Sequence, residues 1–364
     1  MHSIPVSRRK LLQGSALLAA AAFLTPGATL AAGASGAAPA SGKASGNAQA
    51  PVVGSRNVTG TPHKGSAAKV YFSPVIDAAS LIKLYTLVNE NIYGKVAIKL
   101  HTGEPNGPNI LPRDMVKAFQ AQVPDSTIVE TNTLYQGGRD TTAKHRETLK
   151  VNGWTFCPVD IMDEHGDVSL PVADGFHLKE VAMGKGIMDY DSMIVLTHFK
   201  GHAMGGFGGV LKNQSIGVAS RDGKAYIHSA GKTSDPEILW DNIAEQDAFL
   251  ESMAAAAQGV HDHFKGNILY INVMNNMSVD CDCSSHPSDP RLKDIGILAS
   301  DDPVALDQAC LSLVMEVQPA PGNDNQPLLE RITTRHGTHT VDYAEKIGLG
   351  SRQYRLIDID KNDK

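Results

Sequence analysis

Short apolar runs of strand length recur along the chain from residue 67 onward. They lie at 69–72, 96–100, 127–130, 193–197, 268–273, 295–299 and 354–357. Between them, apolar side chains follow helical spacing at 81–92 (with Gly94 as the predicted stop), 113–122, 141–149 and in a long segment begun by Asp235 and Pro236. Strands separated by helices favour parallel pairing, with the helices covering the sheet. The pattern predicts an α/β fold: a mostly parallel sheet flanked by helices in a single large domain, residues 67–364.

The first 66 residues carry a different pattern. Over residues 1–32, Arg8 and Arg9 precede an apolar run, and small residues near Ala31 to Ala34 suit a signal peptidase. The arginine pair is typical of proteins carried by the twin-arginine export machinery. The run is shorter than the roughly 20 residues of a membrane span, so we expect cleavage, release to the periplasm and no stable membrane insertion. Residues 33–66, rich in Gly, Ala, Ser and Pro, predict a disordered linker.

Composition narrows the choice of partners. The chain has 364 residues, with 39 Asp and Glu against 33 Lys and Arg, and a formal net charge of −6. A net-acidic chain with 5 % aromatic residues argues against nucleic acid or an anionic membrane surface as partner. Four cysteines are too few for a disulfide framework or for a ferredoxin-type pair of clusters.

A segment rich in His, Lys and Gly follows the predicted strand 193–197. Its chemistry-bearing residues are His198, Lys200, His202, Gly205, Gly206, Gly208, Gly209 and Lys212. Backbone N–H groups of the glycines, together with Lys212 and with Lys99 at the end of another strand, would form a site for a small anion. The His-x₃-His spacing would place His198 and His202 on one side of a helical turn, as metal ligands. With Lys200 they are also the candidates for catalytic proton transfer.

Two cysteines follow the predicted strand 268–273. In an extended segment the side chains of Cys281 and Cys283 would lie on the same side and could bind one soft metal ion or one edge of a cluster. A redox-active disulfide and a purely structural role are the alternatives. By contrast, Cys310 continues an apolar helical stripe and is expected in the core. Because loops after neighbouring parallel strands meet at one sheet edge, we expect Cys281 and Cys283 to share a pocket with His198, His202 and Lys212.

These motifs together resemble domain-of-unknown-function family 362. The resemblance covers residues 67–364 in order, through segments 197–213, 270–272 with 281–283, 294–300 and 302–307. It implies an iron–sulfur centre protein, for which the family supplies no established reaction. Many such proteins carry an inserted ferredoxin module, which would fall between about Ser229 and Trp240; this interval holds no cysteine, so the resemblance implies a member without it.

Three functions follow from these features. The first is an exported protein that binds a metal ion or an iron–sulfur cluster, as a redox or lyase/isomerase enzyme of a small anionic substrate. The second is a non-catalytic periplasmic protein that binds a metal or ligand through the same residues. The third is a thiol–disulfide oxidoreductase that uses Cys281 and Cys283.

Overall fold

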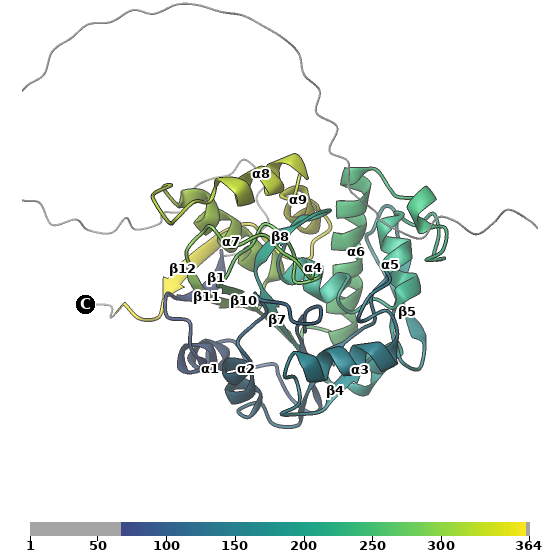
Figure 1. Ribbon diagram of the computed structural model, residues 1–364, viewed down its shortest axis with the longest axis horizontal. Helices are drawn as coiled ribbons and strands as arrows, with labels where there is room; N and C mark the ends of the chain where they lie inside the picture. Colours follow the sequence, from purple (N-terminus) through teal and green to yellow (C-terminus); the bar gives the residue numbers. More distant parts are fainter. Residues whose placement is uncertain (1–66, 362–364) are drawn as a thin grey trace, which may run out of the picture. The chain divides into compact units, whose positions relative to one another are not determined.

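The computed structural model describes residues 67–361, so the predicted signal peptide and the predicted linker lie outside the described residues. An eight-stranded sheet with the order β12-β1-β11-β10-β7-β2-β3-β4 forms its centre (Figure 1). Its strands are β1 (Ala68–Ser73), β2 (Val96–Lys99), β3 (Ser126–Glu130), β4 (Val159–Ile161), β7 (Ser192–His198), β10 (Ile268–Met274), β11 (Gly296–Ser300) and β12 (Tyr354–Asp358). All seven predicted strands are present.

The sheet is mostly parallel, as expected. Strand β11 is the exception: it runs antiparallel to both β1 and β10. Smaller hairpins join β5 (Asp167–Pro171) to β6 (Glu180–Gly184), and β8 (Lys200–His202) to β9 (Gly206–Gly208). The observed architecture confirms an α/β domain with a mostly parallel sheet.

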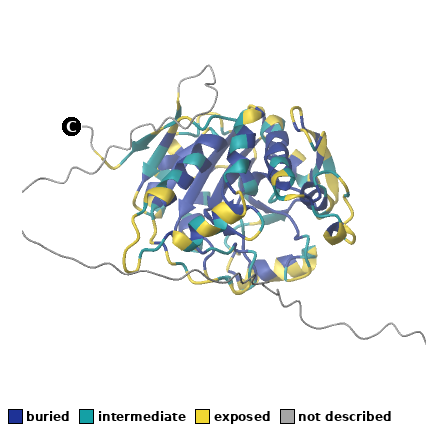
Figure 2. Ribbon diagram, turned by 90° about the horizontal axis from the view of Figure 1, so that it is seen from above, coloured by how far each residue is buried: buried dark blue, intermediate teal, exposed yellow. Residues whose placement is uncertain are grey.

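Helices cover both faces of the sheet, because the central strands are apolar on both sides. In β7, Met193 and Val195 join one buried cluster, whereas Ile194 and Leu196 join the other, as the alternation of side chains along a strand requires. Figure 2 shows these central strands buried between the flanking helices. Helices α1 (Ala78–Thr86), α2 (Arg113–Gln120) and α3 (Thr142–Val151) contribute to one cluster. The other cluster takes residues from α4 (Val210–Ser215), α5 (Arg221–His228), α6 (Gln246–Phe264), α7 (Pro303–Glu316), α8 (Gln326–Thr334) and α9 (His339–Lys346).

Two predicted helix boundaries are wrong. Helix α1 ends at Thr86, before the predicted stop at Gly94, because the polar Asn-Glu-Asn stretch after Val88 has weak helix propensity. The long helix α6 begins at Gln246 rather than after Asp235. The Asp235 carboxylate instead accepts a hydrogen bond from the N–H of Glu237 (2.9 Å), which closes a local turn two residues ahead. Within residues 67–361, none of the helices is both long and apolar enough to cross a membrane.

Candidate metal and anion site

A cavity of about 230 Å³ lies at the carboxyl ends of β2, β3 and β7, where ligands bind in sheets of this kind. Lys99, Glu130 and Thr197 line it from the ends of these three strands. Its charged lining is unbalanced: five basic side chains stand against one carboxylate. The basic residues are Lys99, Arg139, Lys200, Lys212 and Lys224, and the carboxylate is Glu130. Basic side chains therefore outnumber acidic ones in the lining of the cavity.

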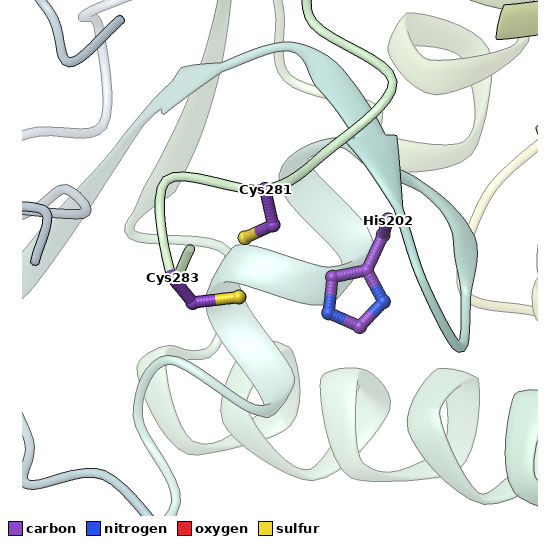
Figure 3. Close-up of side chains that lie close together, drawn as sticks. All are labelled: His202, Cys281 and Cys283. Atoms are coloured by element: carbon purple, nitrogen blue, oxygen red, sulfur yellow. The ribbon is translucent and has the colours of Figure 1, made fainter. Parts of the chain in front are cut away.

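Two sulfurs and one imidazole meet beside this cavity. One ligand atom each of His202, Cys281 and Cys283 lies within 4.8 Å of the others (Figure 3). His202 and Cys283 also line the cavity, and the Lys212 Nζ lies 3.8 Å from the Cys281 Sγ. The expected shared pocket is therefore found for four of the five residues. Sequence spacing brings the cysteines together, and the β8–β9 hairpin adds His202.

The two thiols differ in acidity. The hydrogen bond from the Cys283 thiol, the charge of Lys212 and a hydrogen bond from His101 hold the pKa of Cys281 well below its usual value, against the opposing effect of burial. The pKa of Cys283 is raised, first because it shares that hydrogen bond with Cys281 and then because it is buried. The lowered pKa, with the Lys212 Nζ 3.8 Å from the Cys281 Sγ, favours the thiolate form at Cys281.

Backbone hydrogen bonds determine which nitrogen of His202 carries the proton. Its Nδ1 accepts from the N–H of Gly205 (2.8 Å) and lies 3.3 Å from that of Met204. Burial lowers the pKa of His202 to about 3, so the ring is neutral and its proton is on Nε2. Figure 3 shows a ring nitrogen on the side of the sulfurs. In this arrangement His202 offers the sulfurs an N–H, and it must lose that proton to bind a metal through Nε2.

His198 lies in a different environment from His202. The expected helical turn is wrong: β7 ends at His198 and β8 covers residues 200–202, so the segment is extended. The His198 Nδ1 lies 2.9 Å from the Asp282 carboxylate and its Nε2 lies 2.6 Å from the carbonyl oxygen of Asn275. Both nitrogens therefore already have partners, and the structure does not bring His198 into the group of His202, Cys281 and Cys283.

The buried carboxylate between the cysteines organises the loop. Asp282 is 2.9 Å from the Lys200 Nζ as well as from His198. Burial would raise the pKa of Asp282, but the two partners lower it below its usual value. Lys200 lines the cavity, yet its charge is balanced by this ion pair. Asp282 thus anchors the Cys281–Cys283 segment to the end of β7.

Lys99 is a second cation with a full set of partners. Its Nζ donates to the Leu100 carbonyl (2.7 Å), the Glu130 carboxylate (2.9 Å) and the Asn213 Oδ1 (3.1 Å). These three acceptors match the three N–H groups of an ammonium. The Asn213 amide in turn donates to the Leu196 carbonyl and the Thr197 hydroxyl, so this one side chain connects the ends of β2 and β7.

The glycines of the loop serve packing more than anion binding. The N–H groups of Val210 and Leu211, at the start of α4, donate to the Asp307 carboxylate at 2.9 and 3.0 Å. An internal carboxylate thus fills the place expected for an external anion. A Cβ on Gly209 would lie 2.2 Å from that carboxylate, and one on Gly206 would lie 2.8 Å from Gly337.

Of the four predicted glycines, only two are among the residues that line the cavity. They are Gly208 and Gly209; Gly205 instead donates its N–H to His202. The backbone groups of this loop are therefore largely used within the protein.

Sequence reasoning missed several residues of the cavity. Glu130 was detectable, because it ends a predicted strand. Arg139 was not, since it lies in a loop without periodicity; its guanidinium contacts Glu104 at 2.8 Å and Glu130 at 3.6 Å. Lys224 lines the far part of the cavity from α5, and no motif marks it.

The fold and this site define a class: an α/β domain with a cationic, thiol-containing cavity at the carboxyl edge of its sheet. The chain belongs to the family described as Domain of unknown function (DUF362), whose model matches residues 96–312. A search of curated proteins finds no match.

Among solved structures, the chain is similar to the lactate racemase apoprotein from Thermoanaerobacterium thermosaccharolyticum. The identity is 12 %, the TM-score 0.37, and the match covers 69 % of this chain and 57 % of that one. A protein from Thermotoga maritima matches with 11 % identity and a TM-score of 0.34 over 75 % of this chain and 60 % of that one. The matches thus span less than two thirds of either of those chains.

Proposed function

We propose that this chain is an exported protein that binds a soft metal ion or an iron–sulfur centre through Cys281 and Cys283 and acts on a small anion in the adjoining cavity. The observation that carries the proposal is the position of the two sulfurs. They lie within 4.8 Å of each other, beside a cavity with five basic side chains. A metal held there would supply redox or Lewis-acid chemistry at the point where an anion is bound.

The donor atoms fit a soft metal. Thiolates prefer such ions, and the charge of Lys212 partly offsets that of the sulfurs. Asp282 is held by Lys200 and His198, which leaves the sulfurs as the ligands of this segment. His202 completes the site, as a third ligand once it loses the Nε2 proton, or as an N–H donor that moves a proton to or from a bound anion.

The test is elemental analysis, with an ultraviolet–visible spectrum, of the full chain purified without oxygen. We expect close to one metal ion or one cluster per chain. His202→Ala should lower the metal content or affinity and leave the domain folded, as judged by circular dichroism. Cys157→Ser is the matched control, because Cys157 is a half-buried thiol outside the cavity and should leave the metal content unchanged.

A second function is favoured by the acidity difference within the pair. Cys281, whose pKa is lowered, would attack a disulfide of a partner molecule and release one partner thiol; Cys283 would then displace the second partner thiol and leave a Cys281–Cys283 disulfide. Absence of metal together with a disulfide reducible by dithiothreitol would replace the metal proposal with a thiol–disulfide oxidoreductase. If metal is bound without turnover of any small anion, a non-catalytic binding protein becomes the better description.

Export forms a separate part of the proposal. It rests on the pair Arg8 and Arg9 ahead of a short apolar run. We also propose that this member lacks an inserted ferredoxin module, because residues 229–240 hold no cysteine. Replacing both arginines by lysine should leave the precursor in the cytoplasm, as measured by cell fractionation. Normal periplasmic yield of that variant would contradict export by this route.

A further inference from the structure

The basic residues of the cavity differ in the partners of their amines. Lys99 has three acceptors including Glu130, and Lys200 is paired with Asp282. Arg139 is paired with Glu104. Among residues 67–361, no carboxylate lies within the 4.0 Å of an ion pair from either Lys212 or Lys224. Lys212 lies beside the Cys281 sulfur, whereas Lys224 has only neutral partners.

The partners of Lys224 match a neutral amine. Its Nζ donates to the Thr131 hydroxyl oxygen (2.7 Å) and to the Ala219 carbonyl (2.5 Å). The Thr131 hydroxyl donates its own proton to the Gly217 carbonyl (3.0 Å), so its oxygen can only accept from the lysine. Two acceptors satisfy the two N–H groups of an NH₂ and leave its lone pair available.

The charges around Lys224 support the same protonation state. Burial lowers its pKa to about 7, against the opposing effect of Asp163 and Glu130 and with the help of Lys99 and Arg139. Each of the two carboxylates already has other partners: Asp163 accepts from the N–H of Asn132, and Glu130 from Lys99. Burial thus favours the unprotonated, nucleophilic form of the Lys224 amine.

We propose that Lys224 forms an imine with the carbonyl group of a small 2-oxo acid, whose carboxylate binds to Lys212. This inference deepens the proposed function, since it rests on the anion cavity and names the substrate class. The Lys224 nitrogen attacks the carbonyl carbon, a carbinolamine forms, and loss of one water gives the C=N bond, with no change in oxidation state. Both lysines line the same cavity.

The test uses pyruvate as the probe and sodium cyanoborohydride as the reductant of any imine. The full chain is treated at neutral pH, digested, and each lysine peptide is examined by mass spectrometry. We expect a reduced pyruvate adduct on Lys224 in more than about tenfold excess over any exposed lysine, because exposed amines with a pKa near 10.4 are almost fully protonated. Lys224→Arg keeps a basic side chain that cannot form this imine, and it should remove the adduct.

Binding of the anion is followed separately through Trp240. This side chain is 60 % exposed and lines the cavity, whereas Trp154, the other tryptophan of the chain, is buried. Pyruvate and propionate, which lacks the carbonyl group, should both change the tryptophan emission, and Trp240→Phe should abolish the change. Lys212→Met should weaken both the emission change and the adduct.

The lysine adduct tests the imine, and the change in tryptophan emission tests the anion cavity. An emission change without an adduct on Lys224 would overturn the imine and leave the anion cavity intact. No emission change and no adduct would overturn both. An adduct that persists at equal yield in Lys224→Arg would place the reactive amine elsewhere and overturn the assignment.

Discussion

Cys281 and Cys310 are both buried thiols, and an aspartate lies near each of them. On helix α7, Cys310 lies 3.4 Å from the Asn272 amide, which also donates to Asp307. Asp307 accepts two backbone N–H groups as well, so its carboxylate is occupied by partners within the protein. In the loop after β10, Cys281 has a lysine and a second thiol as partners beside a cavity. Burial of polar groups is common to both regions, and only the region of Cys281 borders the cavity.

The largest expected effect is a loss of bound metal, which distinguishes Cys281 and Cys283 from Cys310. Cys281→Ser and Cys283→Ser should each remove most of the bound metal, because a protonated serine hydroxyl is a poor ligand for a soft ion. Cys310→Ser should keep the metal and lose about 1–3 kcal/mol of stability, since its hydroxyl is buried with poor partners. Metal content and urea unfolding of the anaerobically purified variants measure both. Equal metal content in all of them would end the ligand assignment.

The next largest effect is a loss of affinity for a small carboxylate when Lys212 is replaced. Lys212→Met should weaken the binding of a small carboxylate by about 10–100-fold, the value of one charge-assisted hydrogen bond of roughly 1.5–3 kcal/mol. Lys117→Met is the control, because Lys117 is exposed on α2. Titration by tryptophan fluorescence compares them. An affinity that falls equally in both variants would indicate a general charge effect rather than a site.

A change of one atom at Asp307 disrupts the hydrogen bonds around its carboxylate. Asp307→Asn replaces an acceptor oxygen by an N–H donor, which then faces one of the N–H groups that the carboxylate now accepts. We expect a loss of about 1–3 kcal/mol in the free energy of unfolding, measured in urea. Asp301→Asn, at an exposed neighbouring position, should change it by less than about 0.5 kcal/mol. A similar loss in both variants would contradict the role of Asp307.

The last effect is a dependence of stability on pH, which is small within any one pH unit. The pKa of Lys224 is lowered to about 7, whereas an unfolded lysine titrates near 10.4. Between these values the unfolded chain binds a proton that the folded chain lacks, so this group makes the free energy of unfolding rise with pH. Relative to Lys224→Met, the wild type should gain up to about 1.4 kcal/mol per pH unit in this range. Urea titrations at three pH values test this, and a constant difference would contradict it.

The sequence was sufficient for seven of the eight strands of the central sheet, all but β4, and for the edge of the sheet at which the site lies. Apolar runs mark buried strands, and residues that follow those strands, such as Cys281 and His202, can be identified from the sequence as candidate site residues. Helix starts were harder: Asp235 and Pro236 look like a helix cap, but a turn between Asp235 and Glu237 uses the same residues.

The pairing of charges could not be predicted. Lys99 and Glu130 are 31 residues apart, and His198 and Asp282 are 84 apart, so each contact depends on how the whole sheet is assembled. For the same reason, sequence alone could not separate the lysines with carboxylate partners from Lys224, whose partners are neutral. The spacing of His198 and His202 did not distinguish a helical turn from an extended segment, because residues four apart lie on the same side of either one.

The amide of Asn213 has a consequence for the thermodynamics of ligand binding. Its single side chain connects β2 to β7 through the Lys99, Leu196 and Thr197 oxygens, and its own oxygen fixes the Lys99 ammonium. The floor of the cavity is therefore ordered before any ligand arrives. A ligand entering it does not have to immobilise these groups, which would otherwise cost about 0.5–1.5 kcal/mol for each flexible side chain. That entropy is lost once, when the chain folds, and a small molecule with few contacts can then bind with useful affinity.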